Sequence, residues 1–244
     1  MSSLSTLFTA LLAAVSLASA TPLVRRTAAG NPNLITQLRT STQVNRTNAL
    51  IEDEPDFSNF KFNFLEKLKP GPFGGGVVVA NGETFPAVTG TGISGGVVFL
   101  PPCGMNGAHT HPRASEFAIA SNATVKTGYV MENGAAKFID LTLNPLEGVV
   151  FPQGSIHFQF NDNCDPTMLF VGLSSEDPGT SFAVKNVFAL GNPAASAALG
   201  LPDKINDQNL EAFTDSLPTG IILGAKECAK RCKIDGAPMI KDSN

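Results

Sequence analysis

The chain has 244 residues and a formal net charge of −4, from 17 basic and 21 acidic residues that form no cationic block. This balance argues against a nucleic-acid-binding surface and against a basic patch for membrane surfaces. No apolar run reaches the roughly 20 residues that a membrane-spanning helix needs. We therefore expect no nucleic acid and no membrane among its partners.

The first residues resemble a secretory signal peptide. Residues 7–17 are apolar, and Ala18-Ser19-Ala20 supplies the small residues after which a signal peptidase cuts. We expect residues 1–20 to be removed and the chain to be secreted to an extracellular location. Residues 21–55 then predict an N-terminal arm, with a short helix around 34–40 and no core of its own.

Residues 56–190 predict an all-β barrel or sandwich, because short apolar or alternating runs are separated by Gly, Pro and Asn. Asn133-Gly134 predicts a tight hairpin. Predicted strands are 76–80, 96–100, 116–121, 124–131, 136–143, 148–151, 157–161 and 168–173. Seven phenylalanines fall on these runs, and most of them are expected to fill the core: Phe99, Phe117, Phe138, Phe151, Phe158, Phe160 and Phe170.

Residues 191–244 predict a C-terminal helical extension and tail. An Asn-Pro start followed by alanines predicts a helix at 192–199, and further helices are expected at 207–216 and 225–233. Asn45-Arg-Thr47 and Asn122-Ala-Thr124 have the form of N-glycosylation sites, which in a secreted chain would make Asn45 and Asn122 glycan acceptors.

Four cysteines in a secreted chain predict disulfide bonds. Three pairings of Cys103, Cys164, Cys228 and Cys232 are open. We favour Cys103–Cys164 with Cys228–Cys232, because Cys103 and Cys164 flank two motifs that we expect to meet in space.

Those motifs contain all 3 histidines of the chain. One reads Gly-Ala-His109-Thr-His111-Pro-Arg-Ala-Ser-Glu116, and the other reads Phe151-Pro-Gln-Gly-Ser-Ile-His157-Phe-Gln. In an extended segment His109 and His111 point to the same face. Three imidazoles and a carboxylate are a ligand set for a divalent ion, so the pattern predicts a metal site at His109, His111, Glu116 and His157. Alternation also places Gln159 and Asn161 on the ligand-facing side.

Residues 104–116 and 148–161 resemble the two cupin motifs in their germin form. The first, G-x5-H-x-H-x3,4-E-x6-G, matches at His109, His111 and Glu116, and HTHPRASE is close to the usual germin run HTHPRATE. The second, G-x5-P-x-G-x2-H-x3-N, matches at Pro152, Gly154, His157 and Asn161. Three motif glycines are replaced: Cys103, Ala123 and Leu146 stand in their places. The resemblance, over about residues 56–232, is to germin-like and spherulin-like single-domain cupins, of fungal or slime-mould type.

This resemblance implies a jelly-roll β-barrel that binds Mn(II) through the four residues. Spacing alone leaves Fe(II), Zn(II), Cu(II) and Ni(II) open as alternatives. The resemblance also implies a homo-oligomer and an association with the cell wall or a spore coat. Germin-like proteins include superoxide dismutases, oxalate oxidases and members without known activity.

These relatives suggest three functions: superoxide dismutase, oxalate oxidase, or a non-enzymatic structural role, each with a small anion or carboxylate in or near the site. Oxalate oxidases place two asparagines near the metal. One has a counterpart here in Asn106, whereas Gly96 stands in place of the other, which favours superoxide chemistry over oxalate. Gln159 is a candidate hydrogen-bond donor to the substrate. On this basis Gly96→Asn is expected to raise oxalate oxidation.

Overall fold

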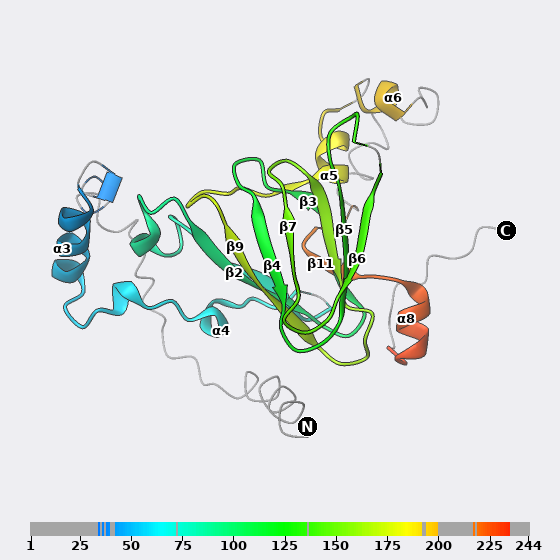
Figure 1. The fold of residues 1–244 in the computed structure, drawn as a ribbon, viewed down its shortest axis with the longest axis horizontal. Helices are drawn as coiled ribbons and strands as arrows, with labels where there is room; N and C mark the ends of the chain where they lie inside the picture. The colour runs from blue at the N-terminus through cyan, green and yellow to red at the C-terminus, as the bar shows by residue number, and fades with distance from the viewer. Residues whose placement is uncertain are drawn as a thin grey trace.

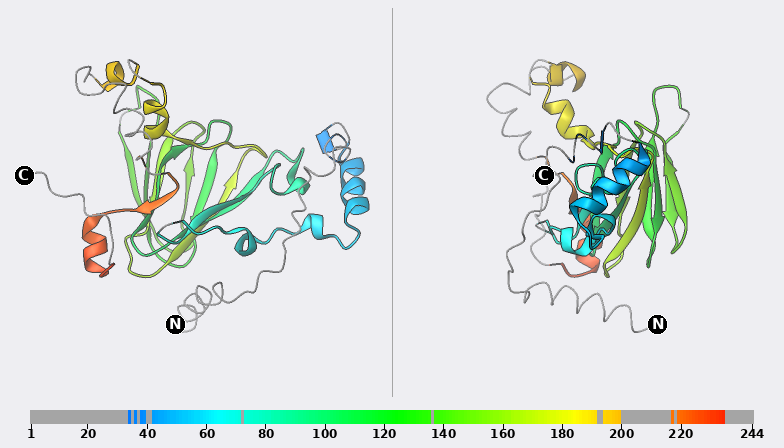
Figure 2. Two further views of the ribbon diagram at one scale, coloured as in Figure 1. Left: turned by 180° about the vertical axis from the view of Figure 1, so that it is seen from behind. Right: turned by 90° about the vertical axis from the view of Figure 1, so that its left-hand side faces the viewer.

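The computed structural model describes residues 34, 36, 38, 39, 42–71, 73–135, 137–191, 194–199, 217 and 219–234. The expected signal peptide and the helix expected at 207–216 lie outside these residues. Figure 1 shows two antiparallel sheets that face one another, with α3 and α8 at opposite ends of the long axis, and the reverse view in Figure 2 agrees.

Both sheets are antiparallel and have jelly-roll connectivity. In the first sheet the order is β1 (Gly76–Ala80), β2 (Ser94–Leu100), β9 (Thr167–Leu173), β4 (Glu116–Ala120) and β7 (Gly148–Phe151). In the second the order is β10 (Ser181–Phe182), β3 (Gly104–Thr110), β8 (Ile156–Phe160), β5 (Val125–Val130) and β6 (Ile139–Leu143), and β11 (Ile221–Leu223) also pairs with β3. Inward side chains of both sheets form the main core, among them Leu100, Ala118, Val125, Phe151 and Leu169. The all-β jelly-roll barrel expected from the sequence is confirmed.

Short helices surround the barrel. They are α3 (Gln43–Asp53), α4 (Phe64–Lys67), α5 (Ala183–Phe188), α6 (Ala194–Leu199) and α8 (Lys226–Arg231), with 3₁₀ turns at Ser58–Phe60 and Pro86–Val88. None of the helices in the described part of the chain has the length and apolarity to cross a membrane.

Strand predictions agree best where apolar residues alternate or run together. The ranges 76–80 and 148–151 match β1 and β7, and the other predicted runs overlap their strands within a few residues. Three strands were not predicted. The segment that becomes β3, GMNGAHT, lacks apolar periodicity, and β10 is only two residues long. β11 lies in the C-terminal extension, for which we expected only helices.

The N-terminal arm has a small core, contrary to our expectation. Leu34 and Leu38 pack against Ala49 and Leu50 of α3, a helix that was itself not predicted. The Thr42 side chain accepts a hydrogen bond from the Asn45 backbone N–H and so begins this helix. Further along, three apolar side chains pack on the outer face of β1 and β2: Phe62, Phe64 and Leu68.

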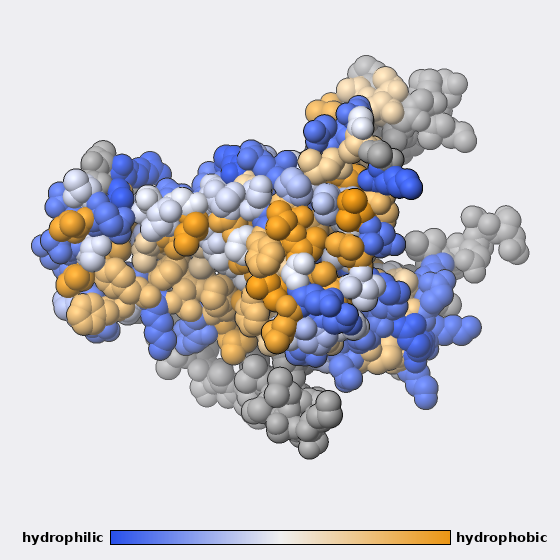
Figure 3. Space-filling model, viewed as in Figure 1, coloured by the Kyte–Doolittle hydropathy of each residue, from blue (hydrophilic) through white to orange (hydrophobic). Residues whose placement is uncertain are grey.

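We expected most of the seven phenylalanines to fill the core, and three of them are exposed instead. Phe99, Phe151 and Phe160 are buried, but Phe117, Phe138 and Phe170 are 48%, 50% and 50% exposed. Phe117 alternates with the buried Glu116 and Ala118, so the pleat of β4 turns its ring outward. Apolar surface gathers over β4 and β7 in Figure 3, where Val150 is also 50% exposed.

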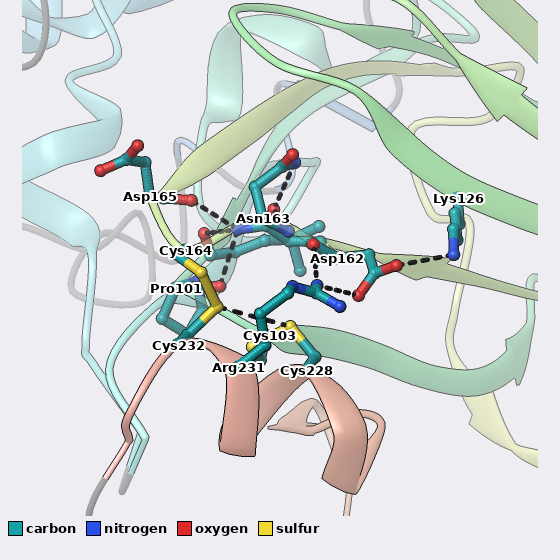
Figure 4. The surroundings of a disulfide bond; sticks show 12 residues. Pro101, Cys103, Lys126, Asp162, Asn163, Cys164, Asp165, Cys228, Arg231 and Cys232 are labelled. Carbon is teal, nitrogen blue, oxygen red and sulfur yellow. Dashed lines mark hydrogen bonds and ion pairs between the residues drawn. A yellow bond between two sulfur atoms is a disulfide. The ribbon is translucent and has the colours of Figure 1, made fainter.

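The disulfide pairing also differs from the one we favoured. Cys103 bonds to Cys228 and Cys164 bonds to Cys232, with Cα–Cα distances of 5.6 and 5.1 Å (Figure 4). The two motifs meet through the antiparallel pairing of β3 with β8, in which His109 lies opposite His157, and need no bridge between them. Cys228 lies on α8 and Cys232 directly follows the helix, four residues further on, so each reaches a different barrel loop.

Two motif positions at which germins have glycine adopt a backbone conformation that favours glycine. Cys103 has φ of 56° and Leu146 has φ of 68°. A side chain with a Cβ is strained in this left-handed region by about 1–2 kcal/mol. The Cys103–Cys228 bridge holds the first of these residues in place, whereas Leu146 lies 83% exposed in the turn before β7.

The double variant Cys103→Ser/Cys228→Ser should lower the free energy of unfolding by about 2–4 kcal/mol, because the bridge closes a long loop. It should contain no free thiol, since Cys164 and Cys232 remain bonded. Chemical denaturation and thiol titration without reductant measure both effects. Peptide mapping that recovers a Cys103–Cys164 peptide would contradict the pairing.

Candidate metal centre

Four polar side chains meet inside one end of the barrel and come from both sheets. His109 lies in β3, His111 directly follows it, and His157 lies in β8, where it is paired with His109. Glu116 begins β4 in the opposite sheet. All four side chains are buried, and their potential ligand atoms lie within 4.8 Å of one another. The structure therefore brings together the four residues that the sequence singled out.

Each imidazole is held by a backbone carbonyl through its Nδ1 atom. His109 Nδ1 lies 2.7 Å from Gly107 O, His111 Nδ1 lies 2.6 Å from Gly179 O, and His157 Nδ1 lies 3.0 Å from Ser155 O. A carbonyl can only accept, so each Nδ1 carries the proton and donates. In a neutral ring this fixes the tautomer whose Nε2 carries the lone pair, which is the usual preparation of a histidine that binds a metal.

Two of these Nε2 atoms lie beside one carboxylate. Glu116 Oε2 lies 2.8 Å from His111 Nε2 and 3.7 Å from His157 Nε2. His157 Nε2 is buried and has no hydrogen-bond partner. A buried nitrogen without a partner is costly in a folded protein, and a metal ion at the centre of the cluster would satisfy it.

Burial and neighbouring charges set the protonation of the cluster. Burial, together with the nearby His157, lowers the pKa of His109 to about 3. Burial alone raises the pKa of Glu116, but the hydrogen bond from His111 and the adjacent His157 ring outweigh it and hold this pKa at about 2. Burial lowers the pKa of His111, yet its bonds to Glu116 and Gly179 raise it above 6.5 overall. At neutral pH His109 is thus neutral and Glu116 is ionised.

Two buried amides extend the cluster. Gln159 is fully buried, and its Nε2 lies 3.4 Å from Glu116 Oε1. Because an ionised carboxylate only accepts, Gln159 must present its amide nitrogen there, and its Oε1 then accepts from Asn106 Nδ2 at 2.8 Å. The chain Asn106–Gln159–Glu116 fixes the carboxylate. Asn161, expected on the same side, instead donates to backbone carbonyls of Leu100, Pro101 and Asp165.

A cavity of about 460 Å³ opens onto the cluster. His109, His111, Glu116 and Asn106 line one part of it, and much of the remaining lining is apolar. Sequence reasoning missed this lining. In β1, the alternation of side chains along the apolar run could have indicated which valines face the cavity. No such signal existed for Ile221, because it comes from β11, more than a hundred residues further along the chain.

The candidate glycan acceptors both lie on the surface. Asn45 is exposed on the first turn of α3, and Asn122 is exposed in the turn between β4 and β5. The Asn122 carboxamide oxygen accepts from Thr167 Oγ1 at 3.0 Å, and its Nδ2 donates to Pro166 O at 3.3 Å.

A jelly-roll barrel with three histidines and a glutamate gathered at one end defines the cupin class. Residues 62–203 match the cupin family. Spherulin-1A of Physarum polycephalum is 33% identical over 207 residues, covering 84% of this chain and 80% of that protein. Germin-like protein 8-11 of Oryza sativa subsp. japonica is 36% identical over 132 residues, covering 54% and 59%.

Among solved structures, recombinant oxalate oxidase in complex with glycolate is similar in fold, with a TM-score of 0.57. It is 24% identical, and the match covers 67% of this chain and 83% of that one. Oxalate decarboxylase from Bacillus subtilis is also similar, with a TM-score of 0.56 at 17% identity, covering 67% and 41%. The chain belongs to the cupin family, as a germin-like and spherulin-like member.

The raised pKa of His111 predicts that metal uptake releases a proton. Below this pKa His111 is charged and shares its proton with Glu116, so an ion must displace that proton. As pH rises through the pKa, His111 becomes neutral and the release falls toward zero. Calorimetric titrations in buffers of different ionisation enthalpy count these protons between about pH 5 and pH 8. A proton release near zero at about pH 5 to 6, below the ordinary histidine pKa of about 6.5, would contradict the assignment.

Proposed function

We propose that the chain is a secreted manganese-binding cupin whose ligands are His109, His111, Glu116 and His157. The observation that carries the proposal is the convergence of three buried imidazoles and one ionised carboxylate, each imidazole being oriented by a carbonyl at Nδ1. Ligand atoms about 2.1 Å from a common ion lie at most about 4.2 Å apart, so the cluster needs to contract by only a few tenths of an ångström.

The donor set suits a divalent ion that keeps open positions. Three neutral imidazoles and one carboxylate leave a net charge of +1, and a six-coordinate ion retains two positions for a small anion. Manganese bound there supplies a one-electron couple between its +2 and +3 states. Fe(II), Zn(II), Cu(II) and Ni(II) are alternatives for the same donors.

The residues of the chain have separate roles in this proposal. The carbonyls of Gly107, Ser155 and Gly179 keep the imidazoles in one orientation. Gln159 holds Glu116 and leaves Asn106 with one further N–H, which can donate to an anion beside the metal. The apolar cavity wall limits the access of bulk water.

We propose superoxide-dismutase-type chemistry as the activity, and oxalate oxidation as the alternative. Superoxide needs an open redox-active ion and an approach path. Oxalate needs added donors that orient a dianion, and good orientation can contribute about 7 kcal/mol or more to the barrier. Gly96 provides no such donor. A Cβ at this position would lie 2.9 Å from Val171 Cγ2 and 3.0 Å from Val78 O, so the space for an amide is already taken.

Other parts of the proposal concern location and assembly. Two disulfides support an oxidising, extracellular location. The exposed apolar side chains Phe117, Val150 and Phe170 support a homo-oligomer. The proposed division is a signal peptide at 1–20, an arm at 21–55, the barrel at 56–190 and a C-terminal extension at 191–244. A non-enzymatic role in a cell wall or spore coat, with the ion as a structural element, is the second candidate function.

The metal assignment is tested on protein produced through a secretory route. Elemental analysis and electron paramagnetic resonance should find about one manganese per chain. His157→Ala should weaken binding by at least about 100-fold, because it removes a ligand, whereas Asn106→Ala should retain the metal. Superoxide consumption without substantial hydrogen peroxide release from oxalate supports the activity. Full metal occupancy in His157→Ala would refute the ligand set.

The crowding at position 96 changes the expectation for Gly96→Asn. The single variant should lose about 1–3 kcal/mol of stability and gain no oxalate oxidation, because its side chain collides with Val171. Gly96→Asn/Val171→Ala should regain part of that loss, since the contact with Val78 O remains, and should release more hydrogen peroxide from oxalate than the parent protein. Val171→Ala alone is the control, and an equal gain in that control would show that added space, not the amide, is responsible.

A further inference from the structure

The inner face of β1 exposes apolar side chains to the cavity. Val77 pairs with Val98 and Val79 pairs with Gly96, so both point inward. The intervening Val78 points outward and is covered by Phe62, Phe64 and Leu68. Val77 is nevertheless 43% exposed. An inward-facing valine that remains open to solvent means that the barrel does not fill its own interior at this edge.

The cavity is large for the anions considered so far. Its volume of about 460 Å³ equals roughly 15 water molecules at about 30 Å³ each, within the range of small-molecule sites. Superoxide or a two-carbon dianion would leave most of it to water. Beyond the metal cluster the wall includes Val77, Val79, Val98, Val171 and Leu173, which favours an apolar occupant.

Charge favours one carboxylate over two. With a net charge of +1 at the metal site, a single carboxylate gives neutrality, whereas a second would carry an uncompensated charge into an apolar space. Among the described residues that line the cavity, Lys69 is the only lysine or arginine, and it is exposed. Gly96, packed against Val171, offers no hydrogen bond to a second carboxylate.

We propose that the cavity binds a monocarboxylate that carries an apolar chain. The carboxylate lies at the His109, His111 and Glu116 end, and the chain lies along the valine wall of β1, β2 and β9. This inference rests on the proposed metal site and names the class of ligand that the site selects. A site with this preference differs from one that selects a small dianion such as oxalate.

Isothermal titration of the manganese-loaded full chain with acetate, hexanoate and oxalate tests the inference. Hexanoate should bind at least about tenfold more tightly than acetate, since its added methylenes leave water. It should also bind more tightly than oxalate. Val77→Ser should remove at least about threefold of the hexanoate affinity and leave acetate binding unchanged. Val150→Ser is the matched control, because it makes the same change in the same sheet at similar exposure, on the outer face.

The outcomes separate this inference from the metal assignment. Manganese occupancy is measured first by electron paramagnetic resonance on the same sample. Normal occupancy with equal affinity for acetate and hexanoate, tighter binding of oxalate, or equal hexanoate losses in Val77→Ser and Val150→Ser, would overturn the ligand class and leave the metal site standing. Absence of manganese binding at the four ligands would overturn both.

Discussion

Three hydrogen bonds from imidazole Nδ1 atoms to backbone carbonyls are the constraint on which the site depends. They hold each ring in one tautomer and one orientation, so the Nε2 atoms face a common point before any ion arrives. Two of the acceptors, Gly107 and Ser155, lie two residues before the histidine that they orient. The third, Gly179, comes from the loop before β10. Correct placement of that loop is therefore part of the geometry of the site.

Burial inside the barrel sets the protonation states that let these four side chains lie close together. Three imidazoles that repel one another when charged are buried against one carboxylate, and burial keeps His109 neutral while the carboxylate stays ionised. Gln159 extends the arrangement. It donates to the ionised Glu116 and accepts from Asn106, so the carboxylate fixes the orientation of both amides. The cavity therefore has two chemically different parts: hydrogen-bonded polar side chains at this end, and apolar side chains at the edge formed by β1.

The sequence was most informative where chemistry is local. The confinement of all histidines to two motifs identified His109, His111, Glu116 and His157, and alternation of apolar residues predicted strands such as Gly76–Ala80. Long-range packing was not accessible. Nothing local indicated that Cys103 bonds to Cys228, or that β11 pairs with β3. The outward rings of Phe117 and Phe170 were misjudged because a strand pattern does not reveal which face is covered.

The pairing of β11 with β3 has a consequence for how the protein is made. Ile221 forms part of the cavity wall, yet the strand that carries it is followed closely by α8, and both disulfides join α8 to the barrel. On the ribosome, the strand with His109 emerges long before its partner β11. The part of the cavity wall that β11 supplies is thus among the last parts of the barrel to form. It is covalently tied to the barrel only after the four cysteines are oxidised. Until then the cluster of His109, His111, Glu116 and His157 lacks its finished enclosure, so the time at which the cysteines are oxidised decides when the cavity closes.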